Sequence, residues 1–204
     1  MKRLISLLVA LMCVSVSAFA EILDFQIGGT ALYNVDAESI QEDSDGLLDI
    51  GNYNFGLDAR LKALVFEGTA LFLYNGKTTA AIDGHESERY HETSFLMTGG
   101  VAFDMVDTVR LGFGIGPRVR VLSRGGDNYV LADDKLVSSP SFGDMWIHAP
   151  FTYRFTCDLL LKPVAVGLSY MIDTDYTIDE NDVADLFGVK WRSGKFGLSL
   201  LLNW

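Results

Sequence analysis

The sequence contains few basic residues, few cysteines and no long apolar run beyond its N-terminus. Its 204 residues include 16 Lys and Arg against 27 Asp and Glu, for a net charge of −11. A nucleic-acid partner requires a basic face, so this balance argues against one. Although 49 % of the residues are hydrophobic, no stretch after the first twenty is long enough for a membrane-spanning helix. The apolar residues must therefore be used in another way.

The N-terminal residues have the features of a secretory signal peptide. Two basic residues precede the apolar segment Leu4–Val16, and residues 18–20 read A-F-A, a small-residue cleavage site. The segment is too short for an anchor helix that spans a bilayer. We therefore expect a cleaved signal peptide over 1–20 and a single domain over 21–204. Of the two cysteines, only Cys157 would remain, which excludes an intrachain disulfide.

The segment Val109–Val121 shows how the apolar residues are used. Its odd positions are apolar, with Pro117 among them, and its even positions are all Gly or Arg. A period of two predicts a β-strand with two chemically different faces. Three glycines and a proline disfavour a helix. At about 3.3 Å per residue the segment would reach roughly 40 Å, a length that suits a tilted strand crossing a bilayer.

The same alternation recurs along the chain. The predicted strands are 25–33, 52–62, 66–74, 95–105, 109–121, 145–156, 164–172 and 196–204. Long polar segments lie near 35–47, 76–93, 123–143 and 173–184, and short turns near 62–65, 105–107 and 158–160. Long loops at one end and tight turns at the other are typical of an outer-membrane barrel. The sequence predicts an all-β, antiparallel, eight-stranded transmembrane β-barrel without helices, with acidic extracellular loops and short periplasmic turns.

The strand count has one ambiguity near the C-terminus. Bulky apolar residues occupy odd positions from Phe187 to Trp191 and even positions from Phe196 onward. A β-bulge at Gly194 within one long final strand explains the change and keeps eight strands. A hairpin at this point is the alternative. The hairpin would give nine strands, and a further strand near Tyr129–Val137 would bring the barrel to ten.

Alternation alone does not decide which face points outward. A soluble lipocalin-like barrel has the same period with its apolar face inside. The Gly- and Arg-rich polar face and the unequal loop lengths favour the membrane barrel. So do the aromatic residues near the predicted strand ends, which resemble an interfacial girdle: Tyr33, Tyr53, Tyr74, Tyr153, Tyr170 and Trp204.

The last predicted strand alternates and ends in an aromatic residue. Its apolar face carries Phe196, Leu198, Leu200, Leu202 and Trp204. With this ending, the chain resembles the small bacterial outer-membrane barrels of the OmpX, OmpA transmembrane-domain and OmpW type, over the whole mature chain as architecture. The resemblance implies residence in the outer membrane, contact with its lipids, and recognition of the terminal strand by the barrel-assembly machinery. The chain departs from the family in ending with Trp, where Phe is commoner.

Several predicted strands carry charges on their polar face. These residues are Asp58, Arg60, Glu67, Asp104, Arg110, Arg118, Arg120 and Arg154. The interior of an eight-stranded barrel is just wide enough for side chains to fill, and buried charges need partners. We expect Arg–carboxylate pairs, with Arg118 and Arg120 nearer the outer mouth and Asp104 and Arg110 nearer the periplasmic end. Structural pairing is favoured over a solute path.

No group of residues predicts catalysis, a cofactor or a defined metal site. His85 and His91 share an acidic loop, where Ser87 only superficially suggests a hydrolase dyad. The segment Asp173–Asp179 is similar to a calcium loop but lacks its glycine at the sixth position. A hydrated loop is favoured there over weak binding of divalent cations.

These observations predict a monomeric, non-enzymatic protein of the outer membrane with a structural or adhesive surface role. The alternative function is a narrow channel for small, apolar solutes. Leu71 and Leu73 interrupt a polar face and would line such a channel.

Overall fold

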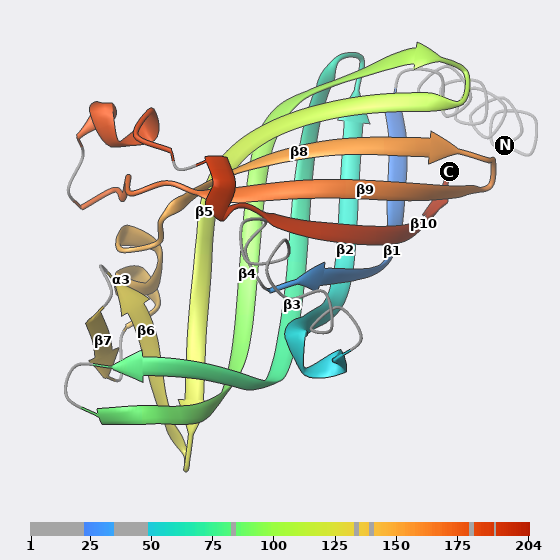
Figure 1. The fold of residues 1–204 in the computed structure, drawn as a ribbon. Coiled ribbons are helices and arrows are strands. Elements are labelled where there is room, and N and C mark those ends of the chain that lie inside the picture. Colours follow the sequence, from blue (N-terminus) through green and yellow to red (C-terminus); the bar gives the residue numbers. More distant parts are fainter. Residues whose placement is uncertain are drawn as a thin grey trace, which may run out of the picture.

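The computed structural model describes residues 23–34, 49–82, 85–132, 135–138, 141–179, 182–189 and 191–204. Eight strands form a closed antiparallel barrel, in which each strand pairs with the next and the last pairs with the first (Figure 1). They are β1 (Leu23–Tyr33), β2 (Tyr53–Ala63), β3 (Phe66–Ile82), β4 (His85–Val106), β5 (Val109–Arg124), β8 (Phe151–Leu160), β9 (Val164–Asp173) and β10 (Lys195–Asn203). The predicted eight-stranded antiparallel barrel is confirmed. The predicted signal peptide and the loop 35–47 lie outside the described residues.

The two ends of the barrel differ in their connections. The end that we call the turn end holds the connections Leu64–Val65, Asp107–Thr108 and 161–163, together with the start of β1 and the C-terminus (Figure 1). The opposite end, the loop end, carries the longer connections. The turn predicted near 158–160 lies slightly later in the chain, because β8 continues to Leu160.

Strands also extend past the barrel rim at the loop end. The segment 76–93, predicted as a loop, is mostly strand, since β3 runs to Ile82 and β4 starts at His85. β5 pairs with β8 up to Pro117 and then with β6 (Asp127–Ala132), which forms a hairpin with β7 (Lys135–Ser138). The sheet therefore has ten strands. Only eight of them close the barrel, so the ten-stranded barrel alternative is wrong.

A short helix replaces the start of one predicted strand. Met145 and Ile147 lie in α3 (Phe142–Ile147), not in a strand, and β8 begins only at Phe151. The Ser141 hydroxyl accepts a hydrogen bond from the Asp144 amide at 3.2 Å, and the Asp144 carboxylate accepts one from the Ser141 amide at 2.9 Å. This capping box explains why a helix starts at this point. None of the helices in the described ranges combines the length and apolar character that crossing a bilayer demands.

The register change near the C-terminus comes from a loop. The β9–β10 connection contains two single-turn helices, η3 (Val183–Leu186) and η4 (Trp191–Ser193), and β10 begins at Lys195. Neither the expected bulge at Gly194 nor a hairpin is formed. Phe187 and Trp191 are exposed loop residues, so their spacing does not report a strand face. A third such helix, η2 (Ile50–Asn52), precedes β2.

Along the strands of the barrel wall, outward and inward positions carry different chemistry. The outward positions of 23–33, 53–63, 66–74, 95–105, 109–119, 151–159, 164–172 and 196–204 hold apolar or aromatic residues, with an occasional Gly, Ala or Pro. No charged residue stands on them. Most of the large apolar side chains among them are exposed, while the polar residues of the same strands are buried. The barrel therefore has an apolar outer surface and a polar interior.

One layer of the interior is apolar. Leu32, Leu71, Leu73, Leu96 and Met171 form a cluster in which every side chain is at most 2 % exposed. They come from β1, β3, β4 and β9 and meet inside the barrel. Across the strand ladders Leu71 pairs with Asp58, Met171 with Arg154 and Leu96 with Arg118, so the apolar layer borders both the central charged groups and those of the loop end.

Candidate functional site

The middle of the barrel holds a buried ion-pair network around Asp58. Its carboxylate accepts hydrogen bonds from Arg60 Nε and Nη2 at 3.1 and 2.8 Å and from Arg154 Nη1 at 3.1 Å. Ser199 Oγ donates to the same carboxylate at 3.0 Å. Arg60 Nη1 also donates to Asp158 Oδ2 at 2.6 Å. The four charged side chains are at most 1 % exposed, so β2, β8 and β10 are joined across the interior.

Glycines make room for this network. A Cβ atom at Gly167 would lie 2.3 Å from Asp158 Oδ1 and 3.2 Å from Arg60 Nη2. A Cβ atom at Gly112 would lie 2.4 Å from Thr156 Oγ1 and 3.3 Å from Glu67 Oε1. At these two positions glycine leaves space for an inward side chain of the paired neighbouring strand, Asp158 or Thr156, and for a charged group from farther around the barrel, Arg60 or Glu67.

A second set of ion pairs closes the turn end. Arg110 Nε donates to Asp104 Oδ1 at 2.6 Å, and its Nη2 donates to Asp24. Lys62 Nζ donates to Asp104 as well. The carboxylates are partly accessible, with Asp104 39 % and Asp24 26 % exposed. This set is therefore more hydrated than the central network.

A third set, the loop-end cluster, consists of Glu92, Arg118, Arg120, Asp173 and Lys195. Arg120 Nε donates to Glu92 Oε1 at 2.8 Å, and Arg118 Nη1 lies 3.3 Å from Asp173 Oδ2. Asp173 also accepts a hydrogen bond from the Thr152 hydroxyl at 2.6 Å, and Lys195 donates to Asn34 Oδ1 at 3.0 Å.

The eight charged residues that the sequence singled out all occupy inward positions. Six of them are buried, while Asp104 and Arg120 are partly exposed near opposite ends of the barrel. Five of their ion-pair partners were not among the predicted interior charges: Asp24, Lys62, Glu92, Asp158 and Asp173. Asp158 occupies an even position, as Arg154 and Thr156 do on the same strand. This alternation could have identified it as an inward residue. Asp158 was missed because it was assigned to a turn, and Glu92 was missed because it was assigned to a loop.

Aromatic residues gather near both ends of the outer wall. At the turn end Trp204 stacks on Phe25, with ring centroids 5.9 Å apart. At the loop end the Tyr153 hydroxyl donates to Leu186 O at 3.1 Å, and the Tyr170 hydroxyl donates to Trp191 O. These two tyrosines attach the β9–β10 loop to the outer wall.

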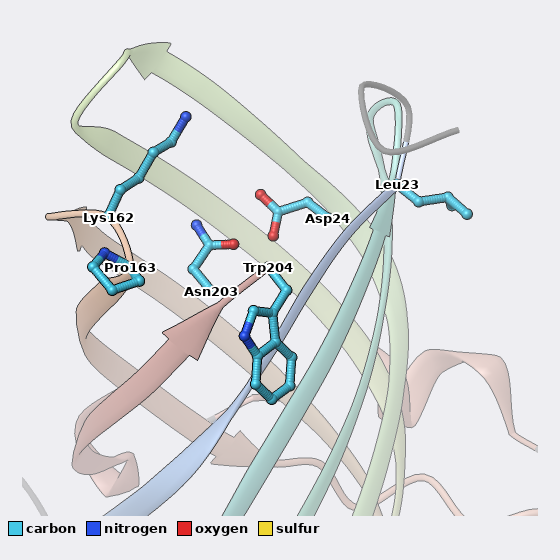
Figure 2. A pocket seen from close by; sticks show the side chains of 6 residues that line it. All are labelled: Leu23, Asp24, Lys162, Pro163, Asn203 and Trp204. Carbon is cyan, nitrogen blue, oxygen red and sulfur yellow. The ribbon is translucent and has the colours of Figure 1, made fainter. Parts of the chain in front are cut away.

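A cleft of about 490 Å³ lies at the turn end, where β1 meets β10. It is lined by Leu23, Asp24, Lys162, Pro163, Asn203 and Trp204. Figure 2 shows that Leu23 points away, while the polar groups of Asp24, Asn203 and Lys162 surround the opening. Asp24 is already bound to Arg110, so the cleft borders the turn-end ion pairs.

No metal centre is apparent in the described part of the chain. No three His, Cys, Asp or Glu side chains within it are placed to hold one ion. In the segment that resembled a calcium loop, Asp173 faces Arg118, and Asp179 lies 3.5 Å from His148 Nδ1. His91 Nδ1 is 2.9 Å from the Tyr74 hydroxyl. The side chains of His85 and Ser87 lie outside the description.

Comparison with known proteins shows similarity at the level of structure and not of sequence. No protein-family model matches the sequence, and no curated protein matches it significantly. Among solved structures, the chain is similar to Ail, the attachment invasion locus protein of Yersinia pestis, with 12 % sequence identity and a TM-score of 0.43. The similarity covers 89 % of this chain and 95 % of that one.

Proposed function

We propose that this chain is an integral outer-membrane barrel with a non-enzymatic surface role, structural or adhesive, and that it presents acidic loops outside the cell. The observation that carries the proposal is the absence of charge from the outward positions of the described barrel wall, combined with buried ion pairs inside. A soluble barrel needs the opposite arrangement, with polar groups facing water. A barrel in a bilayer needs an apolar outer wall and can keep its polar groups inside.

The strand lengths support the same proposal. β1, β2, β8, β9 and β10 have 9 to 11 residues. A tilted strand that crosses the hydrocarbon core needs about 9–11 residues. Lipids of the outer membrane are then the partner of the outer wall. The loop end faces the outside, and the turn end faces the periplasm.

The remaining partners follow from this placement. The terminal strand with Phe196, Leu198, Leu200, Leu202 and Trp204 is the segment that the barrel-assembly machinery would recognise. The acidic loops are candidates for weak binding of divalent cations. The protein functions as a monomer, without a cofactor and without nucleic acid.

The packed interior favours a surface role over a channel. Leu71 and Leu73, which suggested an apolar passage, are buried against Leu32, Leu96 and Met171. Below this layer the Asp58 network joins opposite walls. Both arrangements oppose a continuous solute path.

A charge placed on the outer wall tests the membrane proposal. Leu168 is outward, 61 % exposed and at the middle of β9. Leu168→Arg should lower the free energy of unfolding in lipid vesicles by about 2–4 kcal/mol, the cost of a charge at the bilayer midplane. In a soluble barrel this exposed position would tolerate Arg.

The matched control is Phe187→Arg, at a loop residue that is 78 % exposed. It should fold and insert like the wild-type protein. Folded and boiled samples should migrate differently on detergent gels, and folding from urea should require detergent or lipid. Folding to a monomer in plain buffer would overturn the proposal.

A further inference from the structure

The loop-end cluster has an excess of positive charge. It contains Arg118, Arg120 and Lys195 against two carboxylates, those of Glu92 and Asp173. Lys195 interacts electrostatically with both arginines and both carboxylates, so the five groups share one small volume.

Arg118 is the member of this cluster with unused hydrogen-bond donors. Its side chain is 1 % exposed, and only Nη1 approaches a carboxylate, at 3.3 and 3.4 Å from the two oxygens of Asp173. A charged pair of this kind usually lies at about 2.7–2.9 Å. No described group accepts a hydrogen bond from Nε or Nη2. Asp173 cannot turn toward them easily, since Thr152 holds it at 2.6 Å.

The two unused donors form one edge of the guanidinium. Nε–H and one N–H of Nη2 point in the same direction, in the fork that binds two oxygens of a carboxylate or phosphate side by side. A buried charged donor without an acceptor is unfavourable. The edge is therefore suited to an acceptor that comes from outside the chain.

The members of the cluster differ in their exposure to solvent. Asp173 and Arg120 are 30 % and 20 % exposed, whereas Arg118 and Glu92 are 1 % exposed. Apolar side chains border the cluster: Leu96 pairs with Arg118 across the β4–β5 ladder, and Met171 is the inward residue that precedes Asp173 on β9. Arg118 is therefore the more deeply buried of the two arginines and lies beside the apolar layer.

We propose that the loop-end cluster binds a small oxyanion, a carboxylate or phosphate group, with two of its oxygens on Nε and Nη2 of Arg118. Arg120 and Lys195 supply further positive charge around the ligand. This binding site goes beyond the surface role proposed above and does not depend on what the loops bind.

Thermal unfolding of the full-length folded barrel in phosphatidylcholine vesicles tests the site. The midpoint is followed against inorganic phosphate and against acetate, with chloride used to hold the ionic strength constant so that screening does not change. A ligand that binds the folded state raises the midpoint in a saturable way. We expect this rise with phosphate and acetate. Arg118→Met should weaken the apparent affinity at least tenfold.

Two further variants make the result specific. Lys162→Met removes a cation at the turn end and should leave the phosphate response unchanged. Arg118→Lys keeps the charge but lacks the fork, and should also weaken binding at least tenfold if Arg118→Met does not fold. Equal effects of phosphate and chloride on the wild-type barrel would overturn the proposal, as would an unchanged affinity in Arg118→Lys.

The source of the oxyanion is separated by a second lipid composition. In vesicles that contain phosphatidic acid, an Arg118-dependent rise without free phosphate would identify a lipid headgroup as the ligand. Absence of that rise, with binding of free phosphate, identifies a dissolved ligand. A failure of membrane insertion appears on the detergent gels of wild-type protein and concerns the proposed function, not this site.

Discussion

Gly167 shows how strongly a single inward residue depends on the side chains that other strands send into the interior. Its missing side chain leaves the space that Asp158 and Arg60 occupy. Gly29 has the same residue type on the outward face of β1, with nothing within 4 Å of an added Cβ. The two glycines therefore differ in what they contribute, although the alternation in the sequence treats both simply as small residues.

Substitution of these two glycines should give different results. Gly167→Ala places a methyl group 2.3 Å from Asp158 Oδ1 and forces the buried pair with Arg60 to move. We expect the free energy of unfolding to fall by about 1–3 kcal/mol, as for overpacked cores. Gly29→Ala should change it by less than about 0.5 kcal/mol. Urea unfolding in lipid vesicles measures both, and equal losses would contradict the role assigned to Gly167.

The interior arginines should differ in importance according to burial. Arg60→Met leaves the fully buried Asp158 without its cation and should lower the free energy of unfolding by about 3–5 kcal/mol. Arg110→Leu should cost less, because Asp104 is 39 % exposed and keeps Lys62 as a partner. The same urea titrations give both values. A larger loss in Arg110→Leu would show that the central network is not the main structural element of the interior.

At the scale of elements, the terminal strand combines packing with a proposed role in assembly. Trp204 stacks on Phe25 of β1, next to the seam where β10 closes the barrel. Its ring is 70 % exposed and stands near the proposed periplasmic interface. The loss of its packing alone should therefore be modest.

Trp204→Lys separates recognition from stability. A charge near an interface costs only about 0–1 kcal/mol, so the folded barrel should stay stable. We nevertheless expect most of the chain to remain unassembled in the periplasm, measured as loss of the heat-modifiable form from the outer-membrane fraction. Trp191→Lys, at an exposed loop tryptophan, is the control and should assemble normally. Normal assembly of Trp204→Lys would refute recognition through this residue.

The elements beyond the barrel rim explain where sequence interpretation failed. α3 depends on the capping box of Ser141 and Asp144, which overrides the alternation of Met145 and Ile147. The sequence of 76–93, into which β3 and β4 extend, is mostly polar and does not alternate, whereas β6 overlaps the segment Tyr129–Val137 that was considered as a further strand. Alternation between apolar and polar residues reports a strand only where its two faces meet different surroundings. The extensions of β3 and β4 were therefore assigned to a loop.

For the whole molecule, the distribution of charge inside the barrel bears on conduction. The central network and the apolar layer occupy successive levels of the interior, and an eight-stranded barrel is narrow enough for side chains to fill it. We expect no steady conductance when the protein is inserted into planar bilayers. Ion currents that persist in the wild-type barrel would support the channel alternative.

The sequence by itself determined the fold class. Period-two alternation and the placement of long and short connections specify eight antiparallel strands, the architecture expected from the resemblance to small outer-membrane barrels. The same alternation assigned the charged residues to one face of each strand, because successive side chains along a strand point to opposite faces. These features are local and can be read from neighbouring residues.

The tertiary structure decided which charges meet. Arg60 and Asp158 are 98 positions apart, and Arg154 and Asp58 are 96 apart. Their contacts depend on the stagger and diameter of the closed barrel, which no single strand encodes. Among the described residues, the same closure provides no acceptor for Nε and Nη2 of Arg118, because Asp173 approaches Nη1 instead. The alternation of side chains along each strand placed these groups inside the barrel, and closure of the barrel determined their partners.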